Sequence, residues 1–197
     1  MRALSAILAV SLLASVPAAA DGGRGRYPLE PGYSPSRFLT LAKARPLESV
    51  GRDVIRFTAA HEMTRHEAAV IELRRTRGPW AAGRVVILER VDPGGPGWRV
   101  ATVRAFEIST PAFDSLAADI DSRLPLQAER DLRERTEGVE TICLDGPTYL
   151  TERRVDGIDR WQDGWCGPDH PNVLIARRLS GLLPADIRYR LPYLEWE

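Results

Sequence analysis

Histidines and carboxylates at two places in this sequence have spacings that could support metal binding or catalysis. His61 and His66 enclose Glu-Met-Thr-Arg, which is close to the HExxH signature of zinc proteases. The two histidines are five residues apart instead of four, so on a helix their side chains would point about 140° apart. The flanking residues alternate in polarity, which predicts a turn between two strands. A polar, solvated turn is the simpler interpretation, and a metal held by His61 and His66, assisted by Glu62 or Glu67, is the alternative.

The second place surrounds a hairpin near the C-terminus. Asp145 and Glu152 could act as acid and base in the hydrolysis of a glycan or peptide, and His170 is a third catalytic candidate. In the competing interpretation these carboxylates pair with neighbouring arginines such as Arg153 and Arg154. The sequence has no Gly-x-Ser-x-Gly motif, phosphate-binding glycine loop or dinucleotide fingerprint. A hydrolase is therefore our second choice of function.

The first twenty residues have the pattern of a cleaved secretory signal. Arg2 provides the positive end, residues 3–16 are mostly apolar, and the alanines at 18–20 form a small-residue cleavage site. We therefore expect an exported protein, periplasmic or extracellular, after cleavage near Ala20. No later stretch of the sequence is long and apolar enough to be a transmembrane segment.

The two cysteines, Cys143 and Cys166, predict a disulfide. An even number of cysteines in an exported chain favours pairing, because the compartments outside the cytoplasm are oxidising. On the chain-entropy model, closing this loop stabilises the fold by roughly 3 kcal/mol. A zinc site of Cys143, Cys166 and His170 is the competing interpretation, but structural zinc sites usually carry CxxC pairs, which this sequence lacks.

Acidic and basic residues are balanced over the whole chain. The sequence contains 27 acidic and 27 basic side chains, and Lys43 is the single lysine among the basic ones. So small a net charge gives no reason to expect nucleic acid or an anionic membrane surface as a partner. The predominance of arginine over lysine can reflect coding bias as easily as anion recognition, so we base no function on it.

Hydrophobic periodicity predicts one domain over residues 48–197, preceded by a Pro/Gly-rich arm or linker at 21–47. The predicted fold class is α+β: an antiparallel β-meander with two amphipathic helices packed on one face and a disulfide-stapled C-terminal hairpin. Thr110 is the expected cap of the first helix, and Asp156-Gly157 is the expected hairpin turn. The expected strands are 54–59, 69–74, 84–91, 98–108 with a bulge near Ala101, 139–144, 148–155 and 158–161; the expected helices are 110–124 and 170–183, followed by an aromatic tail at 187–196 that packs onto the domain.

These observations favour a non-catalytic binding or accessory protein of the cell envelope. No motif assembles a catalytic set, whereas a stapled domain with an extended arm suits a partner, which would be an unknown protein or another envelope component. We expect no cofactor and no nucleic acid. The alternative is an envelope hydrolase of glycan or peptide that uses Asp145, Glu152 and His170.

Overall fold

The computed structural model describes residues 37–61, 65–92, 95, 97–124, 146–164 and 168–195 of the 197-residue chain. Several predictions concern residues outside these ranges and stay predictions, among them the signal segment 1–20, most of the arm, the strand at 139–144, the candidate acid Asp145, and the disulfide or zinc site at Cys143 and Cys166. None of the helices in the described part of the chain is long and apolar enough to cross a membrane.

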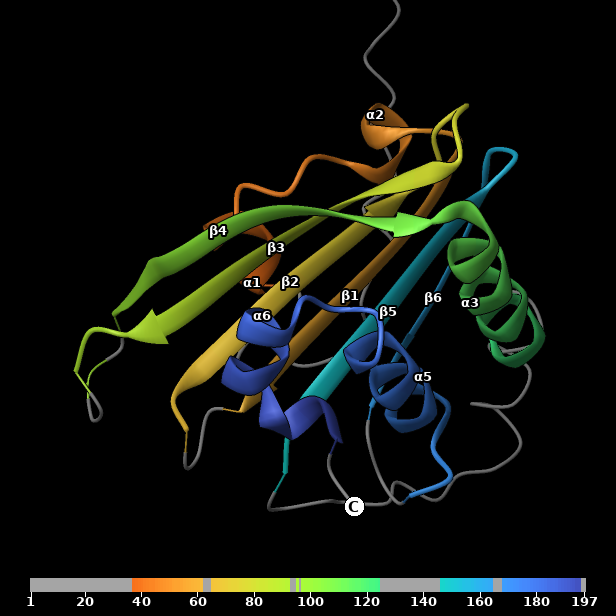
Figure 1. Ribbon diagram of the computed structural model, residues 1–197. Helices are drawn as coiled ribbons and strands as arrows, with labels where there is room; N and C mark the ends of the chain where they lie inside the picture. Colours follow the sequence, from red (N-terminus) through yellow and green to blue (C-terminus); the bar gives the residue numbers. More distant parts are fainter. Residues whose placement is uncertain are drawn as a thin grey trace, which may run out of the picture.

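Six antiparallel strands form one twisted sheet in the order β4-β3-β2-β1-β5-β6 (Figure 1). Consecutive strands from β1 to β4 pair with each other, so the predicted meander is confirmed for these four strands, as is the α+β class. β5 pairs with the other side of β1, and β6 forms the second edge. The strands are β1 (Asp53–His61), β2 (Glu67–Arg74), β3 (Trp80–Arg90), β4 (Trp98–Ser109), β5 (Thr148–Val155) and β6 (Ile158–Asp163).

Two local features of the strands follow the predicted turn chemistry. Asp156 and Gly157 both have positive φ angles, +49° and +83°, as a type I′ hairpin turn between β5 and β6 requires. In the pairing of β3 with β4, Ile87 lies opposite Thr102 and the next pair skips one residue of β4. Ala101 is that extra residue, so the bulge predicted there is confirmed.

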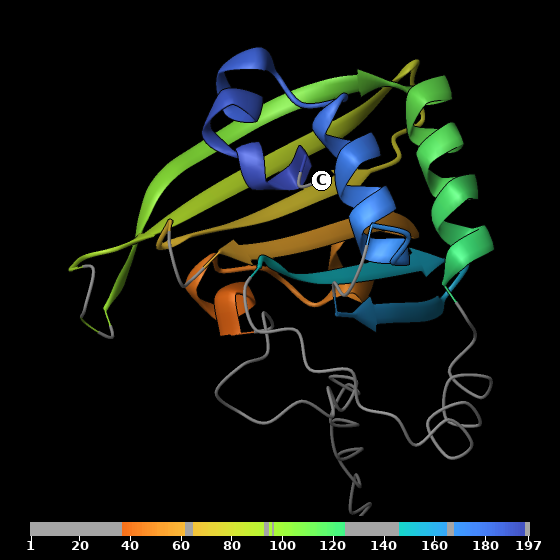
Figure 2. The same ribbon diagram turned by 90° about the horizontal axis from the view of Figure 1, so that it is seen from below.

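Helices α3 (Thr110–Arg123) and α5 (Pro171–Ser180) lie on the same face of the sheet, as predicted (Figure 2). Their apolar side chains share one core with residues of the central strands, including Phe57 and Ile71. The cap of α3 differs from the prediction by one residue. Ser109, not the following threonine, accepts a hydrogen bond from the Ala112 N–H at 3.3 Å.

The C-terminal tail covers the same face in part. It consists of α6 (Ala185–Arg190) and the 3-10 helix η1 (Pro192–Glu195). Tyr193 is 1% exposed and belongs to the core, as the expected packing of the tail requires. Tyr189 is 88% exposed, so the expectation that it packs down is wrong. Packing of the short α6 buries Ile187 and leaves the ring of Tyr189 in solvent.

The opposite face of the sheet is covered by N-terminal residues, of which 37–41 and 47 fall in the predicted arm and 48–50 in the predicted domain. α1 (Arg37–Leu41) places Phe38 against Trp98 of β4, with ring centroids 4.8 Å apart. α2 (Leu47–Val50) packs on Val54 at the start of β1. β1 is consequently buried on both faces, although its alternating pattern predicted a half-buried strand.

Candidate functional site

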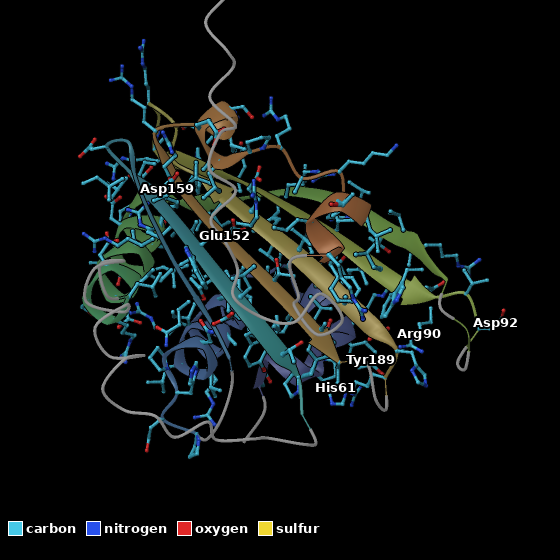
Figure 3. The ribbon with its side chains drawn as sticks, turned by 180° about the vertical axis from the view of Figure 1, so that it is seen from behind. His61, Arg90, Asp92, Glu152, Asp159 and Tyr189 are labelled. Atoms are coloured by element: carbon cyan, nitrogen blue, oxygen red, sulfur yellow. The ribbon has the colours of Figure 1, made fainter. Side chains whose placement is uncertain are left out.

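The structure does not bring the predicted catalytic residues Glu152 and His170 together. Successive residues of a strand face opposite sides of the sheet. Thr151 of β5 contacts α5, so Glu152 faces the other side, which α1 covers and on which Figure 3 looks. His170 lies at the start of α5, on the far side of the sheet from Glu152. The third candidate, Asp145, lies outside the described residues.

Glu152 belongs to a row of alternating charges across four strands, buried at Arg56 and Glu152 and half-buried at the other two positions, which we call the charged row. From β3 to β5 it consists of Arg84, Glu72, Arg56 and Glu152. Arg56 is 3% exposed and donates hydrogen bonds to Glu72 at 2.8 Å and to Glu152 at 3.4 Å. Arg56 also donates to the Arg45 carbonyl at 2.5 Å, in the loop between α1 and α2. The charged row therefore anchors the N-terminal segment, and its carboxylates are engaged by arginine.

His170 has a structural role that sequence reasoning missed. Its Nδ1 accepts a hydrogen bond from the Asn172 N–H at 3.2 Å and caps α5. Burial lowers the pKa of His170, which favours the neutral ring that can accept this bond. The buried Asn172 side chain donates to the carbonyls of Gln162 and Gly164 and accepts from Thr151 at 2.7 Å. His170 and Asn172 together fix the start of α5 against β5 and β6.

His61 and His66 lie at the predicted turn between β1 and β2, and Glu67 pairs across from His61. His61 is 3% exposed, and its ring meets Tyr193 edge to face with centroids 5.9 Å apart. Burial, followed by the positive charge of Arg65, lowers the pKa of His61. Within the described parts of the chain, no group of three or more His, Cys, Asp or Glu side chains is placed to hold a metal ion. Glu62 is outside those parts.

The surroundings of His61 form a closed interior cluster. Burial raises the pKa of Glu67 and of both Tyr149 and Tyr193 above their ordinary values. The Tyr149 hydroxyl donates to the Tyr193 carbonyl at 2.6 Å. The Tyr193 hydroxyl has no hydrogen-bond partner among the described residues. Because His61 and both tyrosines are almost completely buried, we assign this cluster to holding η1 on the sheet, not to binding a substrate.

A depression of about 640 Å³ at the α2 end of the sheet is the described feature best suited to a ligand. It lies between the start of β1 and the β2–β3 loop, and we call it the arginine depression. Its lining residues are Arg52, Asp53, Arg74, Arg75, Thr76, Arg77 and Gly78. Sequence reasoning missed this site, although the basic run at 74–77 directly follows a predicted strand and is visible in the sequence.

Among the described residues, three of the four arginines in the arginine depression have no acidic partner. Arg75 pairs with Asp114 of α3, and Asp53 is held by the buried Arg153 guanidinium at 2.5 Å. In the described part of the chain, no ion pair forms with Arg52, Arg74 or Arg77. The lining residues carry three more positive than negative charges, whereas the whole chain has equal numbers of each.

The loop that carries these arginines is held in place by hydrogen bonds. The Thr76 hydroxyl donates to the Trp80 carbonyl at 2.5 Å. The Thr110 hydroxyl at the start of α3 donates to the Gly78 carbonyl at 2.9 Å, and the Thr110 N–H donates to the Pro79 carbonyl at 2.8 Å. A ligand would therefore meet a loop that is already ordered, which reduces the entropy cost of binding.

Gly51 leaves room for the side chain of Arg74. A Cβ atom at this position would lie only 3.2 Å from Cδ of Arg74. The glycine, which directly precedes Arg52, therefore lets the aliphatic part of Arg74 pack beside it. A second depression of about 520 Å³ adjoins the first at Arg52. It includes the carboxylates of Glu48 and Asp156, so the excess of positive charge is confined to the arginine depression.

Comparison of the chain with protein-family models, curated proteins and solved structures gives no match. The function therefore has to be argued from the geometry. Guanidinium groups bind phosphate, sulfate or carboxylate through paired N–H donors. The Thr76 hydroxyl in the lining is committed to the Trp80 carbonyl. The arrangement is suited to recognising an anion and does not offer an activated nucleophile.

Proposed function

We propose that this chain is an exported, non-catalytic binding protein of the cell envelope that recognises an anionic partner through the arginine depression. The observation that carries the proposal is the presence of Arg52, Arg74 and Arg77, without acidic partners in the described part of the chain, around one depression beside a hydrogen-bonded loop. The N-terminal pattern of an export signal supports the location.

The physical argument concerns the cost of leaving like charges together. Three neighbouring guanidinium groups repel each other unless counter-ions or a ligand neutralise them. An anion that accepts hydrogen bonds from two or more of them relieves this repulsion and gains charge-assisted hydrogen bonds. Because the arginines are exposed, the attraction is screened by salt and gives weak, reversible binding.

The proposal retains the disulfide between Cys143 and Cys166 as a staple of the exported protein. Thiol labelling of the unfolded, unreduced chain checks it, because two reactive thiols would exclude the bond. The geometry adds no support to the hydrolase alternative, since Glu152 and His170 face opposite sides of the sheet.

Binding to immobilised polyphosphate tests the anionic partner. We expect the triple variant Arg52→Ala, Arg74→Ala, Arg77→Ala to lose binding and to flatten the dependence of log K on log salt by roughly 2 to 3. The matched control removes three exposed arginines elsewhere, Arg99, Arg104 and Arg188. This control should keep the affinity of the wild type. Equal losses in both triple variants would show a nonspecific effect of net charge and overturn the proposal, as would wild-type protein that does not bind.

A further inference from the structure

The end of the molecule that carries the arginine depression also exposes apolar side chains at the first residues of two strands, directly after two loops. Trp80, directly after the β2–β3 loop, is 52% exposed. Ile158, directly after the β5–β6 turn, is also 52% exposed. Figure 1 shows the β2–β3 loop, the β5–β6 turn and α2 together at one end of the sheet. This end therefore combines guanidinium groups that pair with no described carboxylate and apolar groups that no described part of the fold buries.

The position of Trp80 is fixed by the same contacts that order the loop. Its carbonyl accepts the hydrogen bond from Thr76, one of the residues that line the arginine depression. An indole has an apolar body and a polar N–H, and such side chains are enriched at the headgroup level of membranes. Arginine beside it supplies donors that match the phosphate groups of lipids.

We propose that this end of the molecule docks on an anionic phospholipid surface, with Arg52, Arg74 and Arg77 on lipid phosphates and Trp80 at the headgroup level. The inference rests on the proposed function and names its partner. Binding hot spots on proteins usually lie near the centre of a large continuous patch. Here the two exposed apolar groups, Trp80 and Ile158, begin separate strands and form no large continuous patch, which suits a fluid surface better than the fixed surface of an acidic protein.

The carboxylates at the same end limit the strength of docking. Glu48 and Asp156 line the adjoining depression, and Asp159 pairs with Arg154 at 2.7 Å. Of the two adjoining depressions, only the arginine depression therefore has an excess of positive charge, and Trp80 and Ile158 would supply further affinity. We expect association that weakens with salt and requires anionic lipid.

Sedimentation of the exported protein, purified after cleavage near Ala20 so that the apolar residues 3–16 are absent, with vesicles tests the inference. The vesicles are phosphatidylcholine alone, or phosphatidylcholine mixed with phosphatidylglycerol. We expect wild-type protein to bind the mixed vesicles and to bind the neutral ones far less. Each arginine near an anionic surface contributes roughly a fivefold factor, so the triple variant of Arg52, Arg74 and Arg77 should lose on the order of a hundredfold. The control variant of Arg99, Arg104 and Arg188 should bind like the wild type.

Trp80→Ala separates this inference from the proposed function. The residue is exposed and pairs with β4 through its backbone, so the variant should fold, which its urea unfolding curve checks. We expect weaker binding to mixed vesicles and unchanged binding to polyphosphate. Wild-type protein that binds polyphosphate but not vesicles would overturn the membrane partner and leave an acidic protein or soluble polyanion. Vesicle binding that is unaffected by both Trp80→Ala and the arginine triple would also overturn it. Binding to neither probe would overturn the proposed function as well.

Discussion

Arg56→Met removes the central cation of the charged row and leaves its carboxylates behind. The substitution keeps an unbranched side chain but deletes the guanidinium that contacts Glu72 at 2.8 Å, Glu152 at 3.4 Å and the Arg45 carbonyl at 2.5 Å. Removing one partner of a buried ion pair costs about 3–5 kcal/mol, because the other charge stays buried without compensation. The Glu72 side chain is 16% exposed and can be partly hydrated. We therefore expect a loss near the lower value, about 3 kcal/mol.

Urea unfolding measures this loss. With a slope of about 2 kcal/mol per molar urea, the midpoint should fall by about 1.5 M. A compensated variant, Arg56→Met with Glu72→Gln and Glu152→Leu, should recover most of the stability because it buries no unpaired charge. A loss below about 1 kcal/mol for Arg56→Met would refute the charged row. A compensated variant as unstable as the single one would show that the unpaired carboxylates are not the cause.

Two further substitutions test the His61 cluster and the close packing of β3 on β4. His61→Gln should make the free energy of unfolding less sensitive to acid. Burial and the charge of Arg65 lower the pKa of His61 in the folded protein. As the pH falls below 6.5, the unfolded wild-type chain therefore takes up this proton before the folded protein does, and the wild type loses stability. Burial raises the pKa of Glu67, which acts in the opposite direction but is present in both proteins. The difference between wild type and variant, measured by urea unfolding at about pH 7.5 and about pH 5.5, therefore reports His61. The same change in stability with pH in both proteins would contradict this expectation. Gly83→Ala should cost about 1–3 kcal/mol, because the new Cβ would lie 2.6 Å from the Phe106 ring. Thermal unfolding should show a smaller cost in a Phe106→Leu background, and an equal cost there would argue against the contact.

The elements of this fold were largely predictable because the signals for them are local. The positive φ angles of Asp156 and Gly157 follow from the residue types at a two-residue turn. The period of two from β1 to β4 and the period of 3.6 in α3 and α5 similarly report the environment of a few neighbouring residues. Burial of the second face of β1 was not predictable in this way. It depends on Phe38 and the rest of α1, whose short sequence gives no periodicity to read.

The candidate site was less predictable than the elements that carry it. His61 and His170 were chosen for their chemistry, and both are explained by packing: one ring lies against Tyr193 and the other caps α5. A histidine in a sequence does not reveal whether its ring will be buried. Glu152 similarly has a side chain capable of acid–base chemistry. Because successive residues of β5 face opposite sides of the sheet, Glu152 faces Arg56 and points away from α5.

The sequence by itself determined the six described strands, the two main helices, the hairpin turn and the bulge, because backbone propensities and hydrophobic periods act over a few residues. Only the tertiary structure decided which charges are neutralised. Arg75 pairs with Asp114 in another element, and Asp53 pairs with Arg153 from a strand far along the chain. The equal numbers of acidic and basic residues in the sequence do not show which of them pair in the fold. An excess of positive charge at one end of the sheet therefore emerges only when folding has matched each charge with its neighbour.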